Sequence, residues 1–443
     1  MAKKDQDTIA STKLARAGKL MNAGAKVGVN YMKYYAKSLS NKSAAKDQLE
    51  EDNAQDIYNA FSELKGGPLK LAQMLSMGDQ LLPKAYTKQF AQAQNKVTPL
   101  SYPLIRKTFF KAVGKFPEEV FDTFSNEAVN AASIGQVHKG TIGDKTYAIK
   151  LQYPGVADSL LSDIKMITPV ATRVLGFTKD EIGPYLDEVQ SKLLEETDYK
   201  LELESSLKIT EACKDLPGIV FPTFEKKLSG KRVLTMSWID GLSLSDWMKT
   251  NPTQAQRNQI GQCLWDFYHY QIHVVRIMHA DPHPGNFLIT DDGKLGVIDF
   301  GCVKEIPTDF YESYIKLIQY GEQHDHPEFI TALVELDLYD PKDEKKKREL
   351  LLNTFSQMFG LVGKPMFSEQ FDFGDDGFFK TIYEQGEALS RNSELRGMSA
   401  RGSNHFIYFN RTYFGLYQLL NQIKAVVNTG DYIKNMLTYK KSA

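Results

Sequence analysis

This 443-residue chain lacks the features that mark several specialised classes of protein. It has three cysteines, an odd number without Cys-x-x-Cys or histidine-rich spacing, which argues against a disulfide framework and against structural zinc. Lysine plus arginine (54) nearly balances aspartate plus glutamate (55), so no overall electric field favours a nucleic-acid partner. We therefore expect a cytoplasmic protein in a reducing compartment that binds no nucleic acid.

Long apolar runs are missing as well. No stretch approaches the ~20 consecutive apolar residues that a membrane-spanning helix needs, and the start of the chain has no apolar segment of the signal-peptide kind. Residues 1–46 carry nine lysines and one arginine against two aspartates. This basic segment is either a solvated tail or a helix on an anionic membrane surface, so any membrane contact is expected to be peripheral.

The composition is otherwise that of a soluble globular protein with room for two or three domains, since 42% of residues are hydrophobic and 25% charged. Apolar periodicity predicts helices up to about residue 125, with a break at Gly66-Gly67-Pro68. A β-hairpin is predicted at 129–151, and strands return at 232–239. Beyond residue 247 the pattern is helical apart from a β-like island at 279–303. Aromatic residues at helical spacing in 406–417 predict a core helix.

The fold class is therefore predicted to be α+β. Four divisions are predicted. Residues 1–50 form a basic N-terminal tail or surface helix, and residues 51–125 form a helical extension. Residues 126–240 form a small lobe built on the hairpin, with a helical insertion around 158–184, and residues 241–443 form a mostly helical large lobe.

The island at 279–303 contains the groups that phosphoryl transfer requires. Asp281 is followed five residues later by Asn286, and Asp299 comes thirteen residues after that. This is the order and spacing of a kinase catalytic loop and magnesium-binding loop. Because magnesium prefers hard oxygen ligands, Asn286 and Asp299 are predicted to bind the metal. Asp281 is predicted to be the catalytic carboxylate that faces the acceptor or water.

Two histidines of the island, His279 and His283, raise the alternative of a zinc site. No third cysteine or histidine lies near them in the sequence, and the neighbouring ligands are of the magnesium type. We predict structural roles for both.

A lysine and a loop for the nucleotide phosphates precede the island. The segment Tyr147–Lys150 matches the Val-Ala-Ile-Lys strand of kinases, so Lys150 is predicted to hold the phosphates and to pair with Glu202. The glycine-rich loop is replaced by an alanine-rich one, which we expect to be stiffer because alanine lacks the conformational freedom of glycine. The loop residues predicted to contact the nucleotide are Asn130, Ala131, Ala132, Ser133, Gly135 and Val137.

Together these residues resemble the UbiB/AarF (ADCK-like) family of atypical protein-kinase-like proteins, whose members include mitochondrial and bacterial proteins that support quinone synthesis. The resemblance covers roughly residues 55–430. The motifs that carry it are Gly67–Gln73 with Leu81-Leu82-Pro83, Ala131–His138, Gln152–Val156, Glu196–Tyr199 and His279–Asn286.

The resemblance implies a two-lobed kinase-like fold whose N-terminal helical extension packs over the active site. The helix of the family's Lys-x-Gly-Gln motif would present Lys70 and Gln73 on one face, with Ala72 at the glycine position. Glu196 and Asp198 would form the acidic motif that engages this helix. Residues 235–239, among them Ser237 and Ile239, would line the adenine through backbone hydrogen bonds.

The resemblance also implies the cofactors and the reaction. ATP or ADP would bind together with Mg²⁺, and the activity would be that of an ATPase or of a small-molecule or lipid kinase that supports isoprenoid quinone biosynthesis. A prenyl lipid or quinone precursor and an anionic membrane surface are the partners that fit this role.

Two other functions are compatible with the sequence. A small-molecule phosphotransferase of the aminoglycoside or choline kinase type also carries His-x-Asp-x-x-x-x-Asn, and phosphotransfer that Lys70→Ala leaves unchanged would favour it. A nucleotide-gated scaffold for lipid-synthesis enzymes would bind ATP and turn it over slowly.

Overall fold

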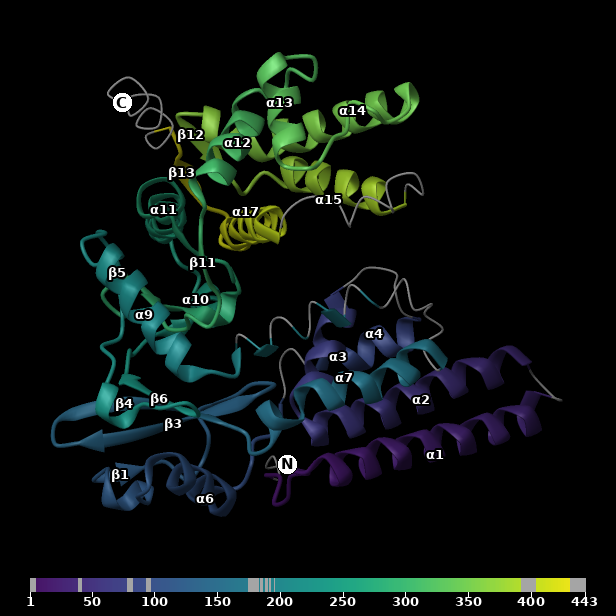
Figure 1. Ribbon diagram of the computed structural model, residues 1–443. Coiled ribbons are helices and arrows are strands. Elements are labelled where there is room, and N and C mark those ends of the chain that lie inside the picture. The colour runs from purple at the N-terminus through teal and green to yellow at the C-terminus, as the bar shows by residue number, and fades with distance from the viewer. Residues whose placement is uncertain are drawn as a thin grey trace. The chain divides into compact units, whose positions relative to one another are not determined.

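The computed structural model describes residues 5–38, 42–77, 83–92, 97–173, 183, 186–187, 190, 193–194, 196–391 and 404–430 (Figure 1). By its internal contacts the chain divides into two compact units. The first unit is Met1–Glu204 with Thr223–Trp238, and the second is Ser205–Pro222 with Ile239–Ala443. The α+β class predicted from the sequence is confirmed, since both units combine helices with small sheets.

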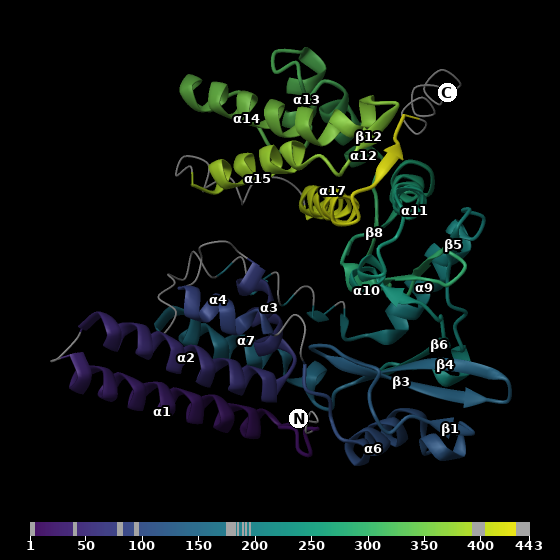
Figure 2. The same cartoon turned by 180° about the vertical axis from the view of Figure 1, so that it is seen from behind.

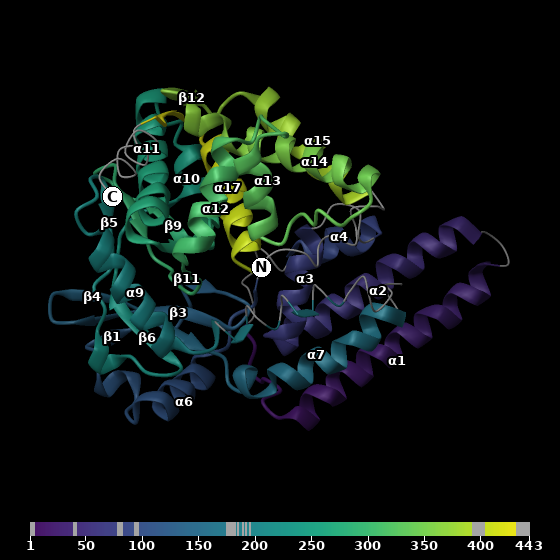
Figure 3. The same ribbon diagram turned by 45° about the horizontal axis from the view of Figure 1, so that its top comes forward.

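The first unit begins with a pair of long helices, α1 and α2, that lie side by side (Figures 1 and 3). Residues Lys13–Ser38 of the basic N-terminal segment are helical, and the contact of this helix with a membrane surface stays a prediction. The predicted break after α2 is also present, because Lys65 and Gly66 both take positive φ values, 58° and 61°, before the next helix starts. The helices of this region are α1 (Lys13–Ser38), α2 (Lys42–Leu64), α3 (Gly67–Met77), α4 (Lys84–Phe90), α6 (Tyr102–Val113) and α7 (Val156–Arg173).

The sheet of the first unit is built on the predicted hairpin, whose strands β3 (Gly135–Ile142) and β4 (Lys145–Gln152) are antiparallel. The strand order is β1-β3-β4-β6, and β2 also pairs with β3. Val137 lies opposite Lys150, and Lys150 lies opposite Leu234. Paired residues share a face of a sheet, so these side chains form one row across it. The other strands are β1 (Thr123–Phe124), β2 (Asn130–Ala131) and β6 (Val233–Ser237).

The second unit contains a small sheet of order β5-β10-β9-β7 and the separate pairs β8–β11 and β12–β13. The strands are β5 (Ile219–Val220), β7 (Leu242–Ser243), β8 (Ile277–His279), β9 (Phe287–Ile289), β10 (Leu295–Val297), β11 (Val303–Glu305), β12 (Gln370–Asp372) and β13 (Val426–Asn428). The helices are α10 (Leu244–Lys249), α11 (Gln254–Tyr270), α12 (Thr308–Gln319), α13 (Pro327–Glu335), α14 (Lys345–Gly363), α15 (Asp376–Arg391) and α17 (Asn404–Gln422). Helix α9 (Tyr199–Cys213) runs from the first unit into the second.

Aromatic side chains fill the core of the second unit. Helix α17 lies beside α11 and leads into β13, as the view from behind shows (Figure 2). Phe409, Tyr413 and Tyr417 of α17 are at most 1% exposed, which confirms that the aromatic spacing of this segment marks a core helix. Within the described part of the chain, no helix has the length and apolar character needed to cross a bilayer.

Candidate active site

The predicted metal-binding residues lie at the same end of a β-hairpin in the second unit. Asn286 directly precedes β9, and Asp299 follows β10, the antiparallel neighbour of β9. The backbone N–H of Ile298 donates to the carbonyl oxygen of Asn286 at 3.0 Å, which ties the two segments together. The hairpin therefore brings together two residues that are thirteen positions apart.

Asp281, the predicted catalytic residue, contacts Asn286 directly. The Asn286 side-chain nitrogen donates to the carbonyl oxygen of Asp281 at 2.8 Å and to its Oδ2 at 3.1 Å. Because the amide nitrogen is turned to Asp281, the amide oxygen is the atom of Asn286 that can serve as a metal ligand. The carboxylate of Asp299 and this amide oxygen are the hard donors that Mg²⁺ prefers, so the residues present fit the predicted ion.

Both histidines of the island have structural roles, as predicted. His279 is fully buried, and its ring bonds to the Tyr268 hydroxyl at 3.1 Å and to the carbonyl oxygen of Asp299 at 2.8 Å. Burial lowers the pKa of His279, so the ring is neutral and donates its one N–H to that carbonyl. The Nδ1 atom of His283 accepts from the Gly285 N–H at 3.0 Å.

Helix α17 supplies a contact that the sequence analysis missed. The Arg411 guanidinium donates to Oδ1 of Asp281, and the two side chains are 26% and 39% exposed. Arg411 lies 130 residues beyond Asp281, so no local spacing could have indicated the contact.

In the first unit, Lys150 and Glu202 form the predicted ion pair. The Lys150 ammonium lies 2.7 Å from Oε1 of Glu202, and the side chains are 16% and 3% exposed. The same ammonium lies 5.2 Å from the centre of the Tyr199 ring. Glu202 stands in the first turn of α9, near the positive end of the helix dipole, where a carboxylate is stabilised.

The alanine-rich loop is a tight turn between β2 and β3. The N–H of Ala132 donates to the Gly135 carbonyl at 2.8 Å, and Asn130 Oδ1 accepts from the Ala131 N–H at 2.9 Å. A Cβ atom on Gly135 would lie 2.5 Å from the Leu151 carbonyl oxygen. Glycine at 135 is therefore required by packing inside the unit, irrespective of any phosphate.

The Lys70 helix is attached to this loop. The Gly66 N–H, one turn before Lys70, donates to the Ser133 carbonyl at 2.8 Å. The Lys70 ammonium pairs with Glu196, as the resemblance implied. Asp198 instead accepts from the Lys200 N–H at 3.1 Å and caps the start of α9.

The remaining residues of the Lys70 helix follow the helical register. Gln73 is partly buried. It lies three positions after Lys70, so the two side chains share a face of the helix. Ala72, at the motif's glycine position, is fully buried in the apolar core of the first unit. The Leu81-Leu82 part of the family motif lies outside the described residues.

Two backbone donors of the predicted adenine segment are used inside the first unit. The N–H of Ser237 donates to the Thr223 carbonyl at 2.7 Å, and the N–H of Trp238 donates to the Thr146 carbonyl at 2.9 Å. The role of Ser237 and Ile239 at the adenine stays a prediction, which would have to use other backbone groups of this segment. Ile239 begins the next stretch of the second unit and lies beside Gly296 of β10.

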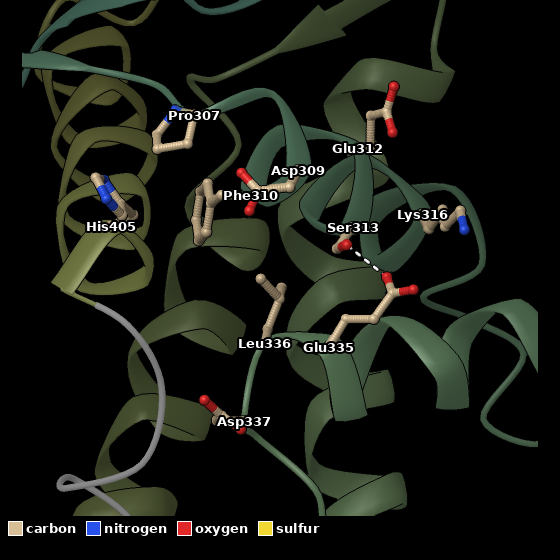
Figure 4. Close-up of a pocket in the computed structure, with 10 residues that line it drawn as sticks. All are labelled: Pro307, Asp309, Phe310, Glu312, Ser313, Lys316, Glu335, Leu336, Asp337 and His405. Atoms are coloured by element: carbon tan, nitrogen blue, oxygen red, sulfur yellow. Dashed lines mark hydrogen bonds between the residues drawn. The ribbon is translucent and has the colours of Figure 1, made fainter.

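A pocket of about 550 Å³ in the second unit is separate from these residues (Figure 4). Four acidic residues are among those that line it, and one of them, Glu335, accepts a 2.6 Å hydrogen bond from Ser313. None of the predicted site residues lines it. The lining residues are Pro307, Asp309, Phe310, Glu312, Ser313, Lys316, Glu335, Leu336, Asp337 and His405.

Curated proteins similar to this chain carry kinase names. The atypical kinase COQ8 of Saccharomyces cerevisiae is 24% identical over 99% of this chain and 88% of its own length. The atypical kinase COQ8B of Danio rerio is 30% identical over 61% of this chain and 44% of its own. A probable serine/threonine-protein kinase, abkA of Dictyostelium discoideum, is 28% identical over 67% of this chain and 55% of its own length. The chain thus spans about half the length of COQ8B and of abkA.

A solved structure with the same fold is that of Rv3197 from Mycobacterium tuberculosis in complex with erythromycin. Its TM-score is 0.60 at 22% identity, over 90% of this chain and 98% of the other. A family model described as the ABC1 atypical kinase-like domain matches residues 92–332, which is more than half of the sequence. The protein therefore belongs to the ABC1, or UbiB/AarF, family of atypical kinase-like proteins.

Proposed function

We propose that this protein binds Mg-ATP and acts as an ATPase or as a small-molecule or lipid kinase that supports isoprenoid quinone biosynthesis. The observation that carries the proposal is the meeting of Asp281, Asn286 and Asp299 at one end of the β9–β10 hairpin. These residues supply a carboxylate and two hard oxygen ligands, which is what phosphoryl transfer asks of a protein.

Each residue has a distinct role in this proposal. Asn286 and Asp299 would hold Mg²⁺, which would supply positive charge to offset the negative charge of the nucleotide phosphates. Lys150, held by Glu202, would bind the phosphates. The acceptor oxygen bonds to the γ-phosphorus while the bond to the ADP oxygen breaks, and the proton of the acceptor passes to Asp281.

Contacts of the Lys70 helix favour this family-type enzyme over a phosphotransferase of the aminoglycoside or choline kinase type. The helix is joined to the alanine-rich loop through Gly66 and Ser133, and it is joined to Glu196 through Lys70. An enzyme that phosphorylates small soluble alcohols needs neither connection.

Steady-state ATP turnover tests the enzymatic proposal and separates it from a slow nucleotide-gated scaffold. We expect wild-type protein to hydrolyse ATP, faster in the presence of anionic liposomes with a prenylated lipid, and Asp281→Asn to lose most of this turnover. Equal turnover by both proteins would refute a catalytic role for Asp281. Tight ATP binding with negligible turnover under all conditions would favour the scaffold.

We also propose that α1 lies on an anionic membrane surface. Leu14, Met21 and Met32 are 85%, 76% and 65% exposed. Met21 and Met32 lie seven and eighteen residues after Leu14, which places all three on one face of the helix. The buried side chains of α1, Arg16, Leu20, Ala23, Val27 and Asn30, lie on the opposite face. Exposed lysines flank the apolar face at positions 13, 26, 33 and 37. An apolar stripe with lysines beside it suits an anionic bilayer.

Vesicle flotation checks the membrane proposal. Wild-type protein should float with phosphatidylserine vesicles, and the pair Leu14→Asp, Met32→Asp should lose this binding. Leu161→Asp, which alters an exposed apolar residue of α7, serves as the matched control. Undiminished flotation of the double variant would refute the proposal. The proposal would also be refuted if the wild type did not float but formed a concentration-dependent dimer that the double variant cannot form.

A further inference from the structure

The carboxylate of Asp281 is held on both sides. Asn286 donates to its Oδ2 at 3.1 Å, and Arg411 donates to its Oδ1. The first donor comes from the catalytic loop itself. The second comes from α17, which is far away in the sequence.

Residues 282–285 of the catalytic loop include no lysine or arginine that could hold the Asp281 carboxylate. Between Asp281 and Asn286 the chain reads Pro-His-Pro-Gly, and the one titratable side chain there, His283, accepts the Gly285 N–H through Nδ1. Its ring is thereby turned to the loop backbone. Any fixed positive charge beside Asp281 must therefore come from another element.

Helix α17 is packed tightly against the loop beside Arg411. Gly415 lies one turn after Arg411 on the same face. A Cβ atom on Gly415 would lie 2.2 Å from Cγ of Pro282, the residue that follows Asp281. Only glycine permits this approach, so the helix backbone and the catalytic loop are in direct contact.

The same face of α17 also reaches the strand beyond the magnesium loop. The Lys304 ammonium of β11 lies 4.7 Å from the centre of the Tyr408 ring, and β11 pairs with β8, which leads into Asp281. Tyr408, Arg411 and Gly415 thus fix α17 to the segments on both sides of the reacting groups.

The position of α17 does not depend on Arg411. Tyr413 and Tyr417 on another face are fully buried, and the Tyr417 hydroxyl donates to the Val362 carbonyl at 2.5 Å. The core therefore holds the helix, and the helix presents Arg411 to the loop.

We propose that Arg411 is a positioning residue for the reaction, which fixes the Asp281 carboxylate from α17 and so supplies the cation that the catalytic loop lacks. This inference rests on the proposed function for its effect on turnover, whereas its effect on the loop does not require ATP. The side chain of Arg411 acts through Asp281, and Lys150, Asn286 and Asp299 remain the groups that bind the nucleotide and metal.

The kinetic test compares Arg411→Met and Arg411→Lys with Lys249→Met, which alters a 75% exposed lysine of α10. Displacing a reacting group by about 1 Å costs up to ~100-fold in rate. We expect Arg411→Met to lower kcat by about 10- to 100-fold with the KM for Mg-ATP changed less than about 2-fold, and Arg411→Lys to recover part of the loss. The control variant should match the wild type.

Hydrogen exchange without nucleotide provides a readout that does not depend on activity. The amides of Ala280, His283, Gly285 and Asn286 are all hydrogen-bonded, so they report the order of the loop. Arg411→Met should speed their exchange, and Lys249→Met should not. Unchanged exchange in Arg411→Met would overturn the proposal.

The two readouts also separate the possible failures. Faster loop exchange with unchanged kcat, in a protein that hydrolyses ATP, would show that the contact is only structural. A raised KM at constant kcat would likewise contradict a positioning role. If the wild type did not bind Mg-ATP, the proposed function would fail, and loop exchange would still decide whether Arg411 positions Asp281.

Discussion

Two lysines of the first unit, Lys70 and Lys150, each hold a glutamate, but their surroundings differ. The Lys150–Glu202 pair is nearly enclosed, with Glu202 only 3% exposed, whereas Lys70 and Glu196 are 18% and 25% exposed. Taking charges out of water is costly unless they are paired, so Glu202 depends strongly on Lys150. The Lys70 pair is more open to exchange with other partners.

Replacing Lys150 should weaken nucleotide binding. Charge-assisted hydrogen bonds to phosphate contribute about 1.5–3 kcal/mol, which corresponds to roughly 10- to 150-fold in affinity. Lys150→Met should lose Mg-ATP affinity by about this factor in an equilibrium titration. Lys145→Met, on the exposed start of the same strand, is the control and should bind as the wild type does. Equal affinities of the two variants would contradict the role given to Lys150.

Buried histidines of the second unit should make its stability depend on pH. His269 and His273 bond to each other at 3.1 Å, and His273 bonds to the Tyr311 hydroxyl at 2.9 Å. Burial lowers the pKa of His273 to about 3 and that of His269 well below its ordinary value. Unfolded histidine titrates near ~6.5, so between about pH 6.5 and 3 the unfolded chain binds more protons than the folded one.

Stability should therefore fall as the pH falls below about 6.5, by up to ~1.4 kcal/mol per pH unit for each histidine. Urea unfolding at pH 7.5, 6.5 and 5.5 measures this. The pair His269→Gln, His273→Gln should show a shallower slope, and the exposed His324→Gln should keep the wild-type slope. A slope that the pair leaves unchanged would show that other groups dominate.

At the scale of elements, single side chains join helices that are distant in sequence. Arg16 of α1 forms a fully buried ion pair with Asp163 of α7, with contacts of 2.7 and 2.6 Å, and donates to the Leu64 carbonyl at the end of α2. Three helices thus meet at one guanidinium, next to the turn that starts α3. The N-terminal helix is in this way part of the first unit's core.

Removing Arg16 should destabilise the first unit strongly. Arg16→Met leaves the buried Asp163 carboxylate without its cation, which typically costs about 3–5 kcal/mol. Lys26→Met, which removes the ion pair of the exposed Lys26 with the partly buried Asp56, should cost less than ~1 kcal/mol. Adding Asp163→Leu to Arg16→Met should restore much of the loss. Urea unfolding measures all three, and a small cost for Arg16→Met would contradict this account of α1.

Two glycines in helices should respond oppositely to alanine. Alanine gains up to ~1 kcal/mol over glycine in a helix interior. A Cβ atom on Gly24 of α1 would meet no packing neighbour within 4 Å among the described residues, so Gly24→Ala should raise the melting temperature. At Gly415 the same gain is outweighed by overpacking against Pro282, which costs about 1–3 kcal/mol. Gly415→Ala should lower both the melting temperature and kcat; an increase in both would contradict the tight packing of α17.

For the molecule as a whole, local patterns predicted what local physics determines. The hairpin at 129–151 and the break at Gly66 follow from turn residues, and the structure contains both. The spacing of Asp281, Asn286 and Asp299 predicts that they lie near one another, and the β9–β10 hairpin with the Asn286–Asp281 hydrogen bond places them so. Composition could not decide whether residues 1–46 form a tail, because the buried face of α1 is defined by its partners α2 and α7.

Contacts between distant residues could not be predicted from the sequence. Arg411 and Asp281 are 130 positions apart, and Arg16 and Asp163 are 147 apart, so no pattern within one element relates them. The hydrogen bond from the Ser237 N–H to the Thr223 carbonyl could not be predicted for the same reason, since it depends on how the chain returns to the sheet.

The central claim is that Asp299 and Asn286 hold the magnesium of a bound nucleotide. Equilibrium titration of ATP with and without Mg²⁺, on the wild type, Asp299→Asn and the exposed turn variant Asp292→Asn, tests it most directly. The account predicts magnesium-dependent binding that Asp292→Asn keeps and Asp299→Asn loses. Failure of the wild type to bind Mg-ATP, or wild-type binding by Asp299→Asn, would contradict it.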